Sequence, residues 1–244
     1  MARSGGIIKI NGSLGDVSFY DSVYGPIVRR KGGPSAEQIK KSPKFERTRE
    51  HNNEFKHCAH AAKLYRQGLY AYIRLSPDHT LVWRVTRLMN QLKDLDDSSA
   101  RGERRVSKGL KRIEGQKLMK GFDLNSKARL ETILKKTFSC KAGSFSIQGL
   151  VPKRDLAGPK GATHVRLSLI LSVIDFEQKK HVVTEDKIEL SFDRKNRDLV
   201  LKPELGKSKG YKIYTLQICF LQEVNGALYP HENKQGNCLS VVGV

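Results

Sequence analysis

The densest group of potential metal ligands in this sequence consists of His51, His57, Cys58 and His60. On a helix, positions 57 and 60 share one face, and positions 51 and 58 share another. Zinc needs three or four protein ligands that converge tetrahedrally, and a single helix cannot wrap all four side chains around one ion. We therefore interpret the histidines as ordinary surface residues, and we expect no metal and no other cofactor.

No nucleophile arrangement of a recognised kind is visible. The G-x-S-x-G pattern of serine hydrolases is absent, while Asp, His and Ser are frequent enough to form chance pairs. We therefore expect a protein that is not an enzyme. The alternative, an enzyme, would require a deep pocket with converging carboxylates or histidines.

Lysines and arginines gather in three clusters, which are the remaining chemical signal. The first cluster is Arg29, Arg30, Lys31, Lys40, Lys41, Lys44, Arg47 and Arg49. The second is Lys56, Lys63 and Arg66, and the third is Arg101, Arg104, Arg105, Lys108, Lys111 and Arg112. Cations held near phosphates release counterions, so these clusters favour nucleic acid or another polyanion as partner. The alternative is a solvated face balanced by Glu46, Glu50 and Glu54.

Aromatic residues lie near the first two basic clusters. They are Tyr20, Tyr24, Tyr65, Tyr70 and Tyr72. Aromatic rings stack on nucleic acid bases without regard to sequence. The spacing of Tyr65 and Tyr72 assigns these two to a buried helix seam instead.

The composition predicts a positive surface over the whole chain. The 244 residues include 45 Lys and Arg against 25 Asp and Glu, which gives a formal net charge of +20. Residues 1–125 carry a net charge of +12 and residues 126–244 carry +8, so no single tail explains the excess. Such a charge attracts polyanions at long range. An incidentally high pI in a soluble protein is the alternative.

Cysteine usage and hydropathy bear on the compartment. The four cysteines, Cys58, Cys140, Cys219 and Cys238, form no C-x-x-C pair. This scatter favours reduced, individually buried thiols and a cytoplasmic protein. No window approaches 18 apolar residues, so we expect no membrane span. The start lacks the apolar stretch of a secretory signal, although release by lysis or by a dedicated machine stays open.

The N-terminal part has the pattern of a small β unit. Strand-like runs cover Ile7–Ile10, Val17–Tyr20 and Ile27–Arg30, and the dipeptide Asn11-Gly12 predicts a turn. Two or three short strands are not stable alone in water. They must therefore pack on the helices that follow or pair with another chain.

Helices are predicted between this β unit and residue 140. Ser35 and Gln38 have the spacing of a capping box, and one long helix is expected from about Phe45 to Arg74. Its apolar seam is Phe55, Cys58, Ala62, Tyr65, Leu69 and Tyr72. Shorter helices are expected near residues 77–96, 106–113 and 126–134.

After Cys140 the spacing of apolar residues changes from the 3.6-residue repeat of a helix to the two-residue repeat of a strand. Strand-like runs cover residues 144–147, 165–173, 181–183, 187–192, 199–201, 212–222 and 239–242, and Asn225-Gly226 predicts a hairpin turn. The predicted fold class is therefore α+β, with an N-terminal short β unit plus helical bundle and a C-terminal antiparallel β-sandwich. We expect a basic strand-and-helix domain over 1–123, a connecting helix over 124–140 and an all-β domain over 141–244.

Segments in both halves of the chain match a known group of sequences. They are Gly12–Tyr20, Val28–Gly32, Ser42–Glu50, Gly161–His164, Asp175-Phe176, Asn225–Tyr229 and Asn237-x-Leu239. These segments resemble a group of uncharacterised proteins from Bacteroidota genomes, and the likeness covers most of the chain. The resemblance implies that the N-terminal strand–helix unit and the C-terminal β module belong together. It implies no catalytic or binding residue.

We therefore predict a non-catalytic basic protein that associates with DNA, RNA or another polyanion. No helix-turn-helix, zinc finger or RNA-recognition motif is present, so we expect binding without sequence specificity. The alternative is a self-assembling structural subunit that does not contact nucleic acid. Such a homo-oligomer would form through edge pairing of the N-terminal strands or through the β-sandwich.

Overall fold

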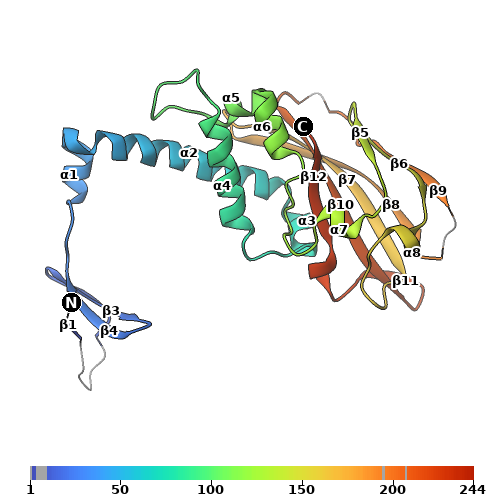
Figure 1. Ribbon diagram of the computed structural model, residues 1–244, viewed down its shortest axis with the longest axis horizontal. Helices are drawn as coiled ribbons and strands as arrows, with labels where there is room; N and C mark the ends of the chain where they lie inside the picture. The colour runs from blue at the N-terminus through green and yellow to red at the C-terminus, as the bar shows by residue number, and fades with distance from the viewer. Residues whose placement is uncertain (1, 4–9, 194–195, 207) are drawn as a thin grey trace. The chain divides into compact units, whose positions relative to one another are not determined.

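The computed structural model describes residues 2–3, 10–193, 196–206 and 208–244. It contains helices and antiparallel sheets, which confirms the α+β class (Figure 1). The chain separates into two compact units, Met1–Arg49 and Glu50–Val244. This division differs from the boundaries expected near residues 123 and 140, because helices and strands of the second unit share one apolar core.

The first unit contains a four-stranded antiparallel sheet in the order β1-β4-β3-β2. Its strands are β1 (Ala2–Arg3), β2 (Gly12–Leu14), β3 (Val17–Ser22) and β4 (Gly25–Arg30). Positions 7–9 of the predicted strand Ile7–Ile10 lie outside the described residues. The turn predicted at Asn11-Gly12 is wrong, because Gly12 pairs with Phe19 inside β2. The tight turn follows β2, where Gly15 takes a φ of +53° that favours glycine.

Two helical segments follow the sheet in the first unit, α1 (Ala36–Lys41) and η1 (Pro43–Phe45). The predicted capping box is confirmed. The backbone N–H of Gln38 donates to Ser35 Oγ at 3.1 Å, and the backbone N–H of Ser35 donates to Gln38 Oε1 at 2.8 Å. These bonds satisfy two N–H groups that the first turn would otherwise leave unpaired.

The predicted long helix is present as two consecutive helices, α2 (Glu46–Gly68) and α3 (Tyr70–Leu75). Four seam residues are fully buried, namely Cys58, Ala62, Tyr65 and Leu69. Phe55 was wrongly assigned to this seam, since 57% of its surface is exposed. Glu54 occupies the buried position instead and is 1% exposed. Glu54 and Cys58 are four residues apart, so they lie on the same face of the helix, and this face is turned toward the core.

The remaining helices are shorter. They are α4 (Leu81–Asp94), α5 (Val106–Lys111), α6 (Ile113–Met119), α7 (Leu130–Ile133) and α8 (Pro152–Asp155). Gly109 allows α5 to approach the backbone of α4 closely, because a Cβ there would lie 1.8 Å from the carbonyl oxygen of Leu92. Gly109 lowers the helix propensity of α5, but the packing of α5 against α4 requires a residue without a side chain at this position.

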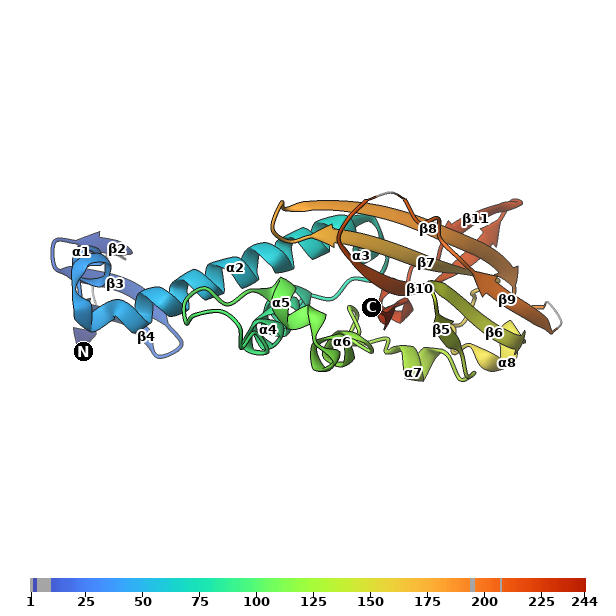
Figure 2. The same ribbon diagram turned by 90° about the horizontal axis from the view of Figure 1, so that it is seen from above.

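The strands after residue 138 form two antiparallel sheets. The three-stranded sheet contains β5 (Ser139–Lys141), β6 (Ser144–Leu150) and β9 (Arg197–Leu201). The curled five-stranded sheet contains β7 (His164–Asp175), β8 (Lys180–Ser191), β10 (Tyr211–Val224), β11 (Ala227–Pro230) and β12 (Cys238–Gly243), and η2 (Lys234–Gly236) precedes its last strand. Figure 2 shows the long strands β7, β8 and β10 side by side. The two runs predicted at 181–183 and 187–192 are thus parts of one strand.

The Asn225-Gly226 hairpin turn is confirmed. Both residues have positive φ, 52° and 78°, and they join β10 to β11 where Val224 pairs with Ala227. This is the backbone conformation that a two-residue turn of type I′ requires.

Both faces of the central strands β7 and β10 are covered. On one face, Ile170, Ile213 and Val241 share a core with residues of α2 and α4. On the other face, Leu167 and Ile218 share a second core with α7 and the three-stranded sheet. Burial on both sides explains why β7 contains far more apolar residues than a half-exposed strand would.

Candidate polyanion-binding surface

The third basic cluster contributes to a buried ion-pair network in the second unit. Arg104 donates to both carboxylate oxygens of Glu54, through Nε at 2.7 Å and Nη2 at 2.7 Å. Lys93 Nζ donates to the same carboxylate at 3.0 Å, as does the backbone N–H of Gly102 at 2.8 Å. Hydrogen bonding to Arg104 above all lowers the pKa of Glu54 to about 2. Arg104 therefore neutralises a buried carboxylate and offers little to a polyanion.

Most other cations of the third cluster also have partners within the chain. Arg101 lies 3.7 Å from Glu50, and Arg112 forms an ion pair with Asp97. Lys108 Nζ donates to Ser99 Oγ at 2.7 Å. Three of the six cations in residues 101–112 are thus paired with carboxylates in the fold, and two others contact an imidazole and a hydroxyl.

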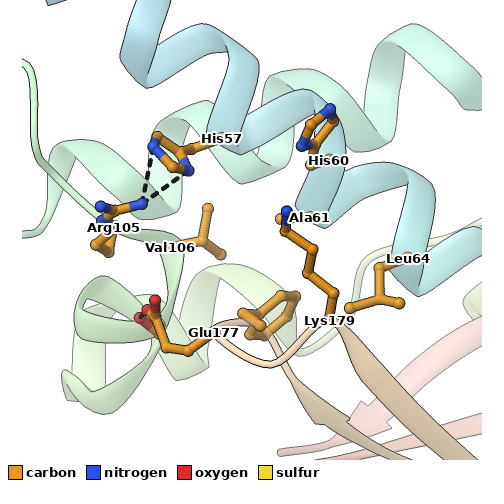
Figure 3. A pocket seen from close by; sticks show the side chains of 10 residues that line it. His57, His60, Ala61, Leu64, Arg105, Val106, Glu177 and Lys179 are labelled. Carbon is orange, nitrogen blue, oxygen red and sulfur yellow. Dashed lines mark hydrogen bonds between the residues drawn. The ribbon is translucent and has the colours of Figure 1, made fainter.

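Arg105 belongs to a small pocket of about 40 Å³ (Figure 3). Its Nη1 lies 2.7 Å and 2.8 Å from the two ring nitrogens of His57. Burial, and then the charge of Arg105, lower the pKa of His57, so that a neutral imidazole faces the guanidinium. Ser107 Oγ donates directly to Glu177 at 2.7 Å. Serine, histidine and carboxylate are therefore not connected in the order that a catalytic triad needs.

A wider groove of about 510 Å³ shares part of this lining. Its cations are Arg105, Lys108 and Lys111, and its carboxylates are Glu103, Asp175 and Glu177. Equal numbers of opposite charges give the groove no net attraction for a polyanion. Among the described residues, no group of three or more His, Cys, Asp or Glu is placed to hold a metal ion.

The exposed side of α2, continued by the first residue of α3, has the opposite character. We call this surface the α2 face, and its exposed side chains are Asn52, Phe55, Lys56, His60, Lys63, Gln67 and Tyr70. Glu54 is the sole acidic residue between positions 51 and 77, and its carboxylate is turned into the core. Within the described part of the chain, Lys56 and Lys63 have no carboxylate at ion-pair distance. The α2 face is therefore positive without compensation.

One further feature of the α2 face suits a polyanion, since Phe55 and Tyr70 are 57% and 64% exposed. Arg66 is half-buried beside this face, and its Nε–H is buried with no acceptor among the described residues, so this N–H is not available to a ligand. Residue-type patterns identified Tyr70 as a neighbour of the cations but missed Phe55. The exposure of Phe55 could have been predicted from the four-residue spacing of Glu54 and Cys58. This spacing puts these two residues on the buried side of the helix and position 55 on its exposed side.

The first basic cluster lies in the first unit. Arg29 and Arg30, being neighbours on β4, point to opposite faces of the sheet. Arg49 is structural, because its Nη1 donates to the carbonyl oxygens of Ile39 and Ser42 at 2.9 Å and 2.8 Å. The other members are exposed, namely Lys31, Lys40, Lys41, Lys44 and Arg47. Ten of the 45 basic residues and four of the 25 acidic ones lie in residues 1–49, a net charge of +6 on a fifth of the chain.

The four cysteines carry free thiols, and three of them, Cys58, Cys219 and Cys238, are buried as predicted. Burial raises the pKa of Cys58 to about 11, which keeps this thiol protonated and unreactive at neutral pH. None of the described helices combines the length and apolarity that crossing a membrane requires.

Comparison with known proteins adds no assignment to this geometry. No family model, no curated protein and no solved structure matches the chain.

Proposed function

We propose that this protein binds nucleic acid, or a polyanion of similar charge density, without catalysis and without reading base sequence. The observation that carries the proposal is the α2 face, where cations are exposed and the one nearby carboxylate is buried. The three basic clusters of the sequence contribute unequally. The second cluster forms the α2 face, the first adds charge from the first unit, and half of the third is paired with carboxylates.

The spacing of the cations supports contacts with a phosphate backbone. Lys56 and Lys63 are seven residues apart on α2, which is about 10 Å along the helix axis. Both can therefore contact phosphates of one strand or of the two sides of a groove. Each such contact releases counterions, so the affinity falls steeply with salt concentration.

The exposed aromatic residues favour single-stranded over duplex nucleic acid. Phe55 and Tyr70 border the cations of the α2 face and are free to stack on unpaired bases. Base stacking on aromatic side chains is tolerant of sequence, in agreement with the lack of a base-reading motif. Duplex nucleic acid offers no unpaired bases and would use the cations alone.

The finer features of the predicted fold fit this function. We interpret the two C-terminal sheets as a small β-sandwich and the helices α2 to α6 as a bundle that holds the α2 face outward. The buried thiols accord with a reducing, cytoplasmic compartment. Both interpretations stay proposals, and the binding surface does not depend on them.

The experiment is a fluorescence anisotropy titration of the full chain with labelled single-stranded DNA, single-stranded RNA, duplex DNA and polyglutamate. Salt is varied from about 50 to about 400 mM, the range in which phosphate contacts are lost. The double variant Lys56→Glu/Lys63→Glu should weaken binding about a hundredfold at low salt and reduce the salt slope by about 2. Unchanged affinity of this variant would exclude the α2 face.

A matched control makes the same change in total charge outside the α2 face. Lys117 and Lys135 are exposed lysines of the second unit outside the α2 face. The variant Lys117→Glu/Lys135→Glu should change the affinity by no more than about threefold, the general effect of net charge. Equal losses in both double variants would mean that only the overall charge matters, and the proposed surface would be wrong.

A further inference from the structure

The sheet of the first unit has one face with four apolar side chains, of which Leu14 is 74% exposed while Val17, Phe19 and Val28 are half-buried. Directly paired residues of antiparallel strands share a face, and the pairs Leu14–Val17 and Phe19–Val28 lie on the same side. We call these four side chains the apolar face. No described residue between positions 10 and 49 is buried, and neither apolar core of the protein contains a residue of this unit.

A unit of this size needs a further source of stability. A small sheet with a hydrophobic face requires a packing partner, and units close to the limit of about 40 residues usually need disulfides, metals or oligomerisation. Residues 1–49 contain no cysteine and no histidine. A disulfide and the nitrogen or sulfur ligands of a structural zinc site are therefore excluded within the unit. Of these three sources, oligomerisation is the one that the composition of the unit leaves open.

The charges on this side of the sheet are arranged to fit a second copy. Asp21 follows Phe19 by two residues, and Arg30 pairs with Val17, so both share the apolar face. Arg30 lies at one end and Asp21 at the other, about 14 Å apart along the strand. Asp16 is 3.6 Å from Arg30, but both side chains are highly exposed, so that pair contributes little.

We infer that the apolar face binds the same face of a second copy of this chain around a two-fold axis. The two-fold axis lies in the plane of the interface and runs perpendicular to the strands at Phe19. In this arrangement Phe19 packs on Phe19 of the second copy, and Val28 packs on Val28. The same rotation brings Arg30 of each copy to the end of the other copy that carries Asp21, on the neighbouring strand and within reach of an arginine side chain, twice per dimer. The inference does not rest on polyanion binding, because no residue of this interface belongs to the α2 face, although Arg30 is also a member of the first basic cluster.

The size of the face sets the expected affinity. Four strands about 4.8 Å apart and about 14 Å of strand length give a footprint of roughly 300 Å² per copy. A standard interface buries about 800 Å² per partner. The dimer should therefore be weak, with a dissociation constant in the micromolar range or above, and dependent on protein concentration.

The test is sedimentation velocity of the full chain without nucleic acid, from about 1 µM to about 500 µM. We expect a monomer–dimer equilibrium. Arg30→Asp should raise the dissociation constant about tenfold or more, because it sets two aspartates against each other at both ends of the interface. The swapped double variant Asp21→Arg/Arg30→Asp should restore the wild-type value.

Arg29→Asp is the matched control, since it makes the same charge change one residue away on the opposite face. It should leave the dissociation constant within about twofold of the wild type. A chain that stays monomeric over the whole range overturns the inference. So does a double variant as weak as Arg30→Asp alone, or an Arg29→Asp variant weakened to the same degree. The recovery expected of the double variant separates loss of the interface from loss of the fold.

Discussion

The α2 face and the segment 101–112 are both rich in cations, and the structure treats them differently. The segment 101–112 has the denser positive charge, six Lys and Arg in twelve residues. It lies beside the carboxylates of Glu50, Glu54 and Asp97, which take up three of its arginines. The α2 face has fewer cations, and none is paired with a carboxylate. Position of the opposite charges, rather than local density, thus decides which basic segment is available to a partner.

The largest effect should come from removing the carboxylate that neutralises the third cluster. Glu54→Gln removes the buried counter-charge of Lys93 and Arg104 while keeping the side-chain volume, and it leaves them only the exposed Asp94 as an ion-pair partner. We expect a loss of about 3–5 kcal/mol in the free energy of unfolding, measured by urea denaturation. Glu103→Gln, at an exposed carboxylate, should change it by less than about 0.5 kcal/mol. A loss below about 1 kcal/mol for Glu54→Gln would mean that the network is only a surface feature.

The same network predicts a stability that falls in acid. The pKa of Glu54 is about 2 in the folded chain against an ordinary value of 4.5. A depressed carboxylate pKa stabilises the fold above the unfolded value, and this contribution is lost as the pH falls from about 5 toward 2. A difference of this size corresponds to about 3 kcal/mol.

Asp78 and Asp96 add to this acid dependence in the same direction. Burial raises the pKa of each, but their hydrogen bonds outweigh it and hold both pKa values well below the ordinary one. Urea denaturation between pH 7 and 3 should therefore show a steep loss in the wild type. The loss should be shallower in Glu54→Gln, and equal slopes in the two proteins would contradict the assignment to Glu54.

A smaller effect should separate the two basic regions by function. Lys63 on the α2 face and Lys111 in the charge-balanced groove are both exposed lysines. Lys63→Glu should weaken binding of single-stranded DNA about tenfold, or about 1.4 kcal/mol. Lys111→Glu should stay within about twofold. If Lys111→Glu is the more damaging change, the third cluster is the binding surface after all.

Much of the architecture was predictable because local pattern and burial agree. The strand β7, the Ser35 capping box and the Asn225-Gly226 turn each follow from a few neighbouring residues. The errors occur where distant contacts decide. The dipeptide Asn11-Gly12 predicts a turn, but Gly12 lies in a strand because Phe19 pairs with it.

The candidate site shows the same limit more sharply. Residue types identified all three basic clusters, but no local pattern shows that Arg104 lies against Glu54, fifty residues away. The sequence places Glu54 and Phe55 side by side, and apolar character alone favours burying the phenylalanine. The spacing of Glu54 and Cys58, four residues apart, instead predicts that Glu54 is buried. Burial of this carboxylate is favourable only because Lys93 and Arg104 lie against it.

The smallest effect concerns that misassigned phenylalanine. Phe55→Ala removes an exposed ring, so the free energy of unfolding should change by less than about 0.5 kcal/mol. If the ring stacks on unpaired bases, affinity for single-stranded DNA should fall about fivefold, or about 1 kcal/mol, while affinity for duplex DNA stays constant. Phe55→Trp keeps a stacking surface and should retain the preference for single strands. Equal losses on both forms of DNA would show that Phe55 only shapes the helix surface, and the preference would then have to come from the cations alone.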